Sequence, residues 1–212
     1  MNNSIVCSSE NNRVSLVGIL STTFEKNYGD NREGFMRAIL KVRRFSGVYD
    51  SITLIAHKHD LEGLELKVGT TVEIEGVLKT YYKPSKYKTV RTYVFVNAIN
   101  ILPADVPHQN QVWLRARFSG YHKIELRFSP FGRQILDFTL SQAQENNSKY
   151  TYNVPCIAWN SDARSLAKVS PGSILVIQGR LQSRIYKKVC PGMQPFSILT
   201  HEISISEVLE VI

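Results

Sequence analysis

Residues 152–186, YNVPCIAWNSDARSLAKVSPGSILVIQGRLQSRIY, decide the fold of this chain. The apolar run 154–159 predicts a buried strand that ends on an aromatic ring, Trp159. A short amphipathic segment around Leu166 predicts a short helix, and Pro171-Gly172 predicts a turn. A second strand then begins at Ile174 and runs into a basic arm. A strand, a short helix, a turn, a strand and a basic arm are typical of the middle of a small five-stranded barrel.

The first half of the chain predicts the same order of elements. A short helix-like segment is expected at residues 57–67, and strands are expected at residues 13–20, 35–44, 51–56, 71–78 and 91–101. Residues 1–12 are polar and are expected to be flexible or partly added to a sheet edge. This half therefore predicts a second barrel of the same kind.

The two halves form an internal repeat. Pro103, Pro107 and the polar residues after them mark a linker at 103–110. Across that linker, equivalent residues recur at offsets that grow steadily from 98 to 103 positions: Asn12-Arg13-Val14 with Asn110-Gln111-Val112, Ala38 with Phe138, Ile55 with Ile157, and Gly76 with Gly179. Because the offset between equivalent residues changes gradually and their order along the chain is kept, the repeat indicates duplication. We predict an all-β fold with short helices, in two tandem five-stranded barrels at residues 1–106 and 107–212.

Three motifs in the second half resemble the bacterial single-stranded DNA-binding protein family. They are the Cys-x-x-Trp strand end at 156–159, the Pro-Gly-Ser turn at 171–173, and Gly-Arg-Leu-Gln-Ser-Arg-x-Tyr at 179–186. The resemblance implies that each barrel is an oligonucleotide-binding (OB) fold. It also implies assemblies that present four OB folds, which a chain with two barrels reaches as a homodimer.

The chain differs from that family in two respects. It stops directly after its last predicted strand, without the glycine-rich tail and acidic tip that recruit replication and repair proteins in that family. Replication or repair proteins stay candidate partners, recruited without such a tip or through another protein. The family also tends to carry an aromatic residue early in the third strand, where Asn153 and Ser51 stand here, and His57 stands where the second half has Trp159. We therefore expect the first barrel to depend more on its tyrosine-rich hairpin.

The composition excludes several classes of protein. A formal net charge of +8 favours a polyanionic partner. The 3 cysteines lack paired spacing, which fits a reducing cytoplasm and excludes a disulfide framework. Because the sequence has no nucleophile elbow, phosphate loop or metal-spaced cluster, we predict neither an enzyme nor a cofactor or metal. No apolar run suits a membrane span and the start is not a secretory signal, so we expect a cytoplasmic, nucleoid-associated protein.

The hairpin at residues 79–91 carries the strongest signal for binding. It holds 5 basic residues and 3 tyrosines without an acid, and single-strand binding needs cations for phosphates and flat side chains for bases. A solubilising hairpin whose tyrosines pack on the barrel is the alternative. The corresponding arm of the second half alternates basic, polar and aromatic residues from Arg180 to Tyr186.

Other candidates lie on the strands. Basic residues share one face of the strand at 35–44, which is also what a solvated face looks like. In the resembling family the aromatic at the place of Trp159 stacks on bases, whereas Trp113 should face outward, toward DNA or a second subunit. The predicted single-stranded DNA-binding residues are Arg37, Lys41, Arg43, Lys79, Tyr81, Tyr82, Lys83, Lys86, Tyr87, Lys88, Arg91, Trp113, Trp159, Arg180, Arg184, Tyr186 and Lys187.

Together these features predict sequence-independent binding of single-stranded DNA in replication, repair or recombination. Two alternatives stay open: an accessory OB module of replication restart that mainly docks proteins, and an RNA-binding OB protein. A docking module would tolerate loss of the tyrosines, and an RNA reader would prefer RNA over DNA of the same sequence.

Overall fold

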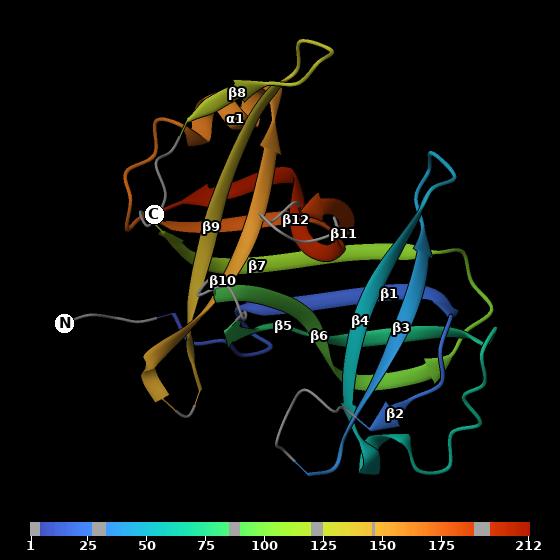
Figure 1. Ribbon diagram of the computed structural model, residues 1–212. Coiled ribbons are helices and arrows are strands. Elements are labelled where there is room, and N and C mark those ends of the chain that lie inside the picture. The colour runs from blue at the N-terminus through green and yellow to red at the C-terminus, as the bar shows by residue number, and fades with distance from the viewer. Residues whose placement is uncertain (1–4, 27–32, 85–89, 120–124, 146, 189–195) are drawn as a thin grey trace.

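Each half of the chain forms a closed β-barrel, as the computed structural model shows (Figure 1). Alternation of apolar and polar residues along the strands puts apolar side chains on the inner face of each barrel and polar ones on the outer face. The structure describes residues 5–26, 33–84, 90–119, 125–145, 147–188 and 196–212. The first half contains the 3-10 turn η1 (Lys58–Leu61) and strands β1 (Asn12–Leu20), β2 (Glu25–Lys26), β3 (Phe35–Arg43), β4 (Tyr49–His57), β5 (Thr71–Pro84) and β6 (Val90–Pro103). The second contains helix α1 (Asn160–Leu166) and strands β7 (Gln109–Ser119), β8 (Leu126–Phe128), β9 (Gln134–Gln144), β10 (Asn147–Trp159), β11 (Ile174–Lys188) and β12 (Phe196–Val211).

Each barrel closes in the same way. In the first, β1 pairs with both β3 and β5, and β4 pairs in parallel with β6. In the second, β7 pairs with both β9 and β11, and β10 pairs in parallel with β12. This strand order is that of the OB fold, so the predicted fold class is confirmed. The domain limits at residue 106/107 stay a prediction.

One local expectation needs correction. Only Lys58–Leu61 of the helix-like segment 57–67 is helical, because Gly63 and Gly69 turn the chain with positive φ angles of 80° and 92°. Residues 5–11 are partly added to a sheet edge, which is one of the two arrangements expected for the N-terminal segment. Val6 bridges to Ala143 on β9, and Cys7 is fully buried, with its pKa raised to about 11 mainly by that burial.

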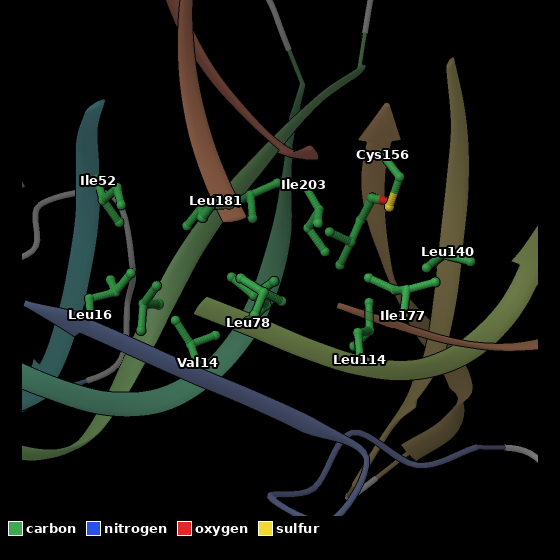
Figure 2. Packing of buried hydrophobic residues seen from close by; sticks show 14 of the residues in the cluster. Val14, Leu16, Ile52, Leu78, Leu114, Leu140, Cys156, Ile177, Leu181 and Ile203 are labelled. Carbon is green, nitrogen blue, oxygen red and sulfur yellow. The ribbon is translucent and has the colours of Figure 1, made fainter. Parts of the chain in front are cut away.

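The barrels are joined by antiparallel pairing of β1 with β7, which makes one continuous sheet. Val14 faces Val112 in this pairing, and these two are equivalent residues of the repeat, so the barrels are related by a local two-fold axis at that pair. Buried residues of both barrels form a single hydrophobic cluster, in which Val14, Leu78, Leu114 and Leu181 lie close to the junction (Figure 2).

In each barrel, one asparagine side chain holds the first strand to a neighbouring strand through two hydrogen bonds to the backbone of one leucine. We call this arrangement the asparagine bracket. The Asn12 side chain accepts from the Leu78 N–H at 2.9 Å and donates to the Leu78 carbonyl at 2.9 Å. Asn110 does the same to Leu181, at 2.8 Å and 2.7 Å. Both brackets lie just after a β-bulge whose glycine touches backbone: a Cβ at Gly76 would be 2.3 Å from the Asn97 oxygen, and one at Gly179 would be 2.6 Å from the Ser204 oxygen.

We predict that Asn12→Ala lowers the free energy of unfolding by about 1–3 kcal/mol, because it leaves buried donors and acceptors without partners. Asn12 is fully buried and also donates to Gln142 of the second barrel at 2.9 Å. Urea unfolding measures the loss. Asn100→Ala, at an exposed position of β6, is the control and should change little. Equal stability of the two variants would show that the bracket does not stabilise the fold.

Candidate nucleic-acid interface

Five arginines converge on one groove over the outer face of the second barrel. The hollow has a volume of about 620 Å³. We call it the arginine groove and define it by Arg44, Arg127, Arg133, Arg180 and Arg184. Its other lining residues are Ser129, Pro130, Phe131, Ile135, Ile157, Trp159, Gln182 and Glu202. Interleaved guanidinium groups and aromatic rings are the groups that bind phosphates and unstacked bases.

The β8–β9 turn forms one wall of the arginine groove. Pro130 begins the turn, and the Ser129 N–H donates to the Arg133 carbonyl at 2.8 Å while the Gly132 N–H donates to the Ser129 carbonyl at 2.9 Å. These bonds fix the turn without using its middle residue. Phe131 therefore stands with 91% of its surface exposed, which is a ring available for stacking.

Trp159 lies in the groove at the end of β10, directly before α1. Its indole N–H donates to the Ser204 hydroxyl at 3.3 Å, so the ring is held against β12. It is half-buried. A ring fixed in this way loses little freedom when a base stacks on it.

Acidic side chains fix the orientation of most of the groove's arginines. Arg184 pairs with Glu202 at 3.4 Å, and Gln182 donates to the same carboxylate at 2.7 Å. Arg127 donates to Asp137 through two nitrogens, at 2.5 Å and 3.1 Å. Each guanidinium carries five N–H donors, so a carboxylate partner leaves donors for a phosphate.

The fifth arginine, Arg44, comes from the first barrel. It begins the turn between β3 and β4 and binds Asp50, whose carboxylate also accepts hydrogen bonds from Arg180 at 3.4 Å and from the Ser183 N–H at 2.7 Å. Burial and the neighbouring charge of Arg44 hold the pKa of Arg180 below its ordinary value. The bond to Asp50 raises the pKa of Arg44. The groove is therefore assembled by both barrels.

Three of the predicted residues, Trp159, Arg180 and Arg184, meet in the arginine groove. The other predicted residues whose side chains the structure describes lie elsewhere. Arg37, Lys41 and Arg43 are exposed on the outer face of β3, as their alternation predicts. Trp113 lies on the outer face of the sheet between the barrels, with the Arg13 guanidinium 5.2 Å from its ring centre.

The tyrosine-rich hairpin packs partly on its own chain. Tyr81 stacks on Tyr93 with ring centres 4.9 Å apart, and the Tyr82 hydroxyl accepts a hydrogen bond from Asn153 of the second barrel. Lys79 is half-buried on β5. Lys86, Tyr87 and Lys88 lie outside the described residues, as do the side chains of Lys83, Arg91, Tyr186 and Lys187.

Sequence reasoning missed four lining residues: Arg44, Arg127, Phe131 and Arg133. The signal for three of them is the run Arg127 to Arg133, in which two arginines flank two phenylalanines around a Pro-Phe-Gly turn. For Arg44 the sequence held no signal, because its position depends on how the two barrels pack.

Residues 110–205 match the model of the Single-strand binding protein family. The match spans most of the second barrel, which is therefore similar to that family. The wild-type single-stranded DNA binding protein of Thermus aquaticus superposes with a TM-score of 0.66 at 21% identity, covering 93% of this chain and 91% of that one. A deletion variant of the same protein gives 0.67 at 20% identity, covering 93% and 92%. These likenesses establish the shared fold of both barrels.

Two further comparisons add no argument about function. The N-terminal domain of PriB from Thermoanaerobacter tencongensis is 33% identical and covers 45% of this chain and 98% of its own, with a TM-score of only 0.35. No curated protein matches the sequence.

Within the described part of the chain, we find no helix with the length and apolarity to cross a membrane, and no cluster of three or more metal-ligating side chains.

We predict that protein stability falls as pH is lowered from about 7 through the ordinary histidine pKa of 6.5 because of His201. This buried imidazole lies on β12 and its Nε2 contacts the Ser51 carbonyl of the first barrel at 2.7 Å. Burial lowers the pKa of His201 despite the opposing effects of that carbonyl and of Asp50. The unfolded chain thus binds the proton more readily, and the stabilisation present at higher pH is lost on acidification.

Thermal unfolding of the wild type and of His201→Gln, measured between about pH 7.5 and 5.5, checks this prediction. Glutamine keeps an N–H donor but does not titrate, so the decline should be shallower in the variant. His59→Gln, at an exposed position, is the control and should follow the wild type. A parallel decline in all three proteins would assign the pH dependence to other groups.

Proposed function

We propose that the chain binds single-stranded DNA in the arginine groove, without catalysis. Its arginines bind the phosphates, and Phe131 and Trp159 stack on bases. The observation that carries the proposal is the interleaving of five guanidiniums and two accessible rings along one hollow of an OB barrel. The name of the matching family and of the Thermus protein point the same way.

This chemistry does not depend on base identity. Every base has a flat face, and each stack contributes about 1–3 kcal/mol, so a few stacks suffice for binding without sequence choice. Phosphate contacts release counterions from the strand, so affinity falls with salt at a slope near −0.7 per phosphate neutralised. We propose that such binding covers exposed strands in replication, repair or recombination, in association with the nucleoid.

The experiment that tests the proposal is a titration of tryptophan fluorescence with oligo-dT of increasing length at two salt concentrations. Duplex DNA and oligo-U serve as competitors. Quenching with a length threshold and a preference for oligo-dT over both competitors supports the proposal. Preference for oligo-U would favour RNA binding, and weak binding without a threshold would contradict strand binding and leave a role in protein docking.

We predict that Phe131→Ala with Trp159→Ala weakens binding to oligo-dT by about 2 kcal/mol or more, because two stacking surfaces are lost. Fluorescence anisotropy of a labelled oligonucleotide measures the loss. Tyr150→Ala is the control, since it removes a ring that is 63% exposed but does not line the groove. An unchanged affinity in the folded double variant would remove these rings from the proposed site.

We further propose that two chains form a homodimer through the outer face of the sheet that joins the barrels. Arg13 and Trp113 face each other there across β1 and β7, at the local two-fold axis. The same face has a hollow of about 760 Å³, lined from both barrels, with the exposed Ile99 at its edge. A two-fold interface with a second copy would bury this face and give four OB barrels per assembly.

We predict that Trp113→Glu converts the dimer to a monomer, because the apolar ring at the two-fold axis is replaced by a carboxylate whose desolvation in the interface the neighbouring Arg13 offsets only in part. Sedimentation velocity should give twice the chain mass for the wild type and the chain mass for the variant. Tyr150→Glu is the control for an added surface charge and should stay dimeric. A monomeric wild type would contradict the proposed dimer and leave the proposal of strand binding untouched.

A further inference from the structure

A carboxylate of the first barrel lies buried beneath the arginine groove. Asp50 is on β4, and its side chain is only 1% exposed. Arg44 donates to it through Nε at 2.8 Å and through Nη2 at 2.5 Å, and Arg180 approaches from the second barrel at 3.4 Å. The Ser183 N–H on β11 donates to the same carboxylate at 2.7 Å. Asp50 is thus the meeting point of both barrels and two groove arginines.

The arrangement leaves both arginines available to the groove. The Arg44 side chain is 26% exposed and that of Arg180 is 38% exposed, so each guanidinium has one edge on Asp50 and another toward the hollow. Arg44 also donates to the Ser183 carbonyl at 3.2 Å, and Arg180 donates to Gln182 at 2.9 Å. These contacts fix both planar groups in one orientation.

Without the carboxylate, the two guanidiniums would not stay in place. They are close enough for the charge of Arg44 to lower the pKa of Arg180. The negative charge of Asp50 between them compensates that repulsion. Removing it from a buried site would leave two like charges side by side, and both long side chains would turn out into solvent.

We propose that Asp50 is a positioning residue for strand binding: it holds Arg44 of the first barrel and Arg180 of the second with their free edges toward the same stretch of phosphate backbone. The inference rests on the proposed function and extends it. It makes the arginine groove a composite site that neither barrel completes alone.

Asp50→Asn in the full chain separates positioning from simple charge. Asparagine keeps an oxygen that can accept from Ser183 but loses the negative charge. If Asp50 only neutralised the groove, its loss would make the groove more positive, and oligo-dT would bind more tightly with a steeper salt dependence. If Asp50 positions the arginines, affinity should fall about tenfold, since charge-assisted contacts are lost. The salt slope should then shrink by about 0.7–1.4, equal to one or two phosphates.

Two further variants complete the test. Glu65→Gln makes the same change in charge at a side chain that is 90% exposed and forms a surface ion pair with Lys67 at 3.7 Å. The affinity of this variant should stay within about twofold of the wild type. Arg44→Lys keeps the charge but loses the planar fork that grips Asp50. We expect about fivefold weaker binding and a smaller salt slope from it. This variant decides the question if Asp50→Asn does not fold, as judged by circular dichroism.

The outcomes separate this inference from the proposed function. A wild type that does not bind oligo-dT contradicts the proposed function itself. A wild type that binds, with Asp50→Asn binding equally or more tightly, overturns only the positioning role, as does an Arg44→Lys variant with wild-type affinity and salt slope. Weaker binding and a smaller slope in both variants, with Glu65→Gln unchanged, support it.

Discussion

The antiparallel pairing of β1 with β7 decides where every other part of this protein lies. It aligns Val14 with Val112 and so relates the two barrels by a local two-fold axis. The asparagine brackets at Asn12 and Asn110 hold each first strand to its own barrel at the same height. The β3–β4 hairpin of the first barrel then lies against β11 of the second, where the Ser51 N–H donates to the Ser183 hydroxyl. The arginine groove follows from that contact, because Arg44 directly follows β3 and Asp50 is the second residue of β4.

The two barrels share one backbone arrangement, but the side chains at equivalent positions of the arginine groove and of the first barrel differ. At the place of Trp159 the first barrel has His57, whose ring meets Phe35 edge-on at 5.3 Å. At the place of Arg180 it has Val77, which is buried. One pair of hydrogen bonds between the barrels is nonetheless equivalent: the Ser51 N–H donates to the Ser183 hydroxyl at 2.9 Å, and the Asn153 N–H donates to the Thr80 hydroxyl at 3.2 Å. Duplication has kept the packing contacts and let the two binding faces diverge.

Local patterns were enough to predict the fold, but only part of the site. Alternation along the strands, the Pro-Gly turns and the order of the repeats can be read from the sequence alone, so they predicted two barrels and put Arg180 and Arg184 on one face of a strand. The role of these arginines and of Trp159 in binding stays a prediction. Arg44 and Asp50 depend on contacts between residues 130 or more positions apart in sequence, and no local pattern encodes these contacts.

A buried carboxylate in a site proposed to bind a polyanion is unexpected only if the net charge of the site alone determines its affinity. Long cationic side chains that are free in water lose conformational entropy when they bind a phosphate, and that loss offsets much of the Coulomb attraction. In the proposed site, Asp50 lowers the positive charge of the groove by one unit and orients two guanidiniums before a strand binds. Glu202 and Asp137 have the same relation to Arg184 and Arg127. Three carboxylates for five arginines leave the groove positive, and most of its cations are already oriented. Such a groove relies on orientation more than on charge, so variants that keep the charge but lose the planar fork of arginine should separate the two contributions most clearly.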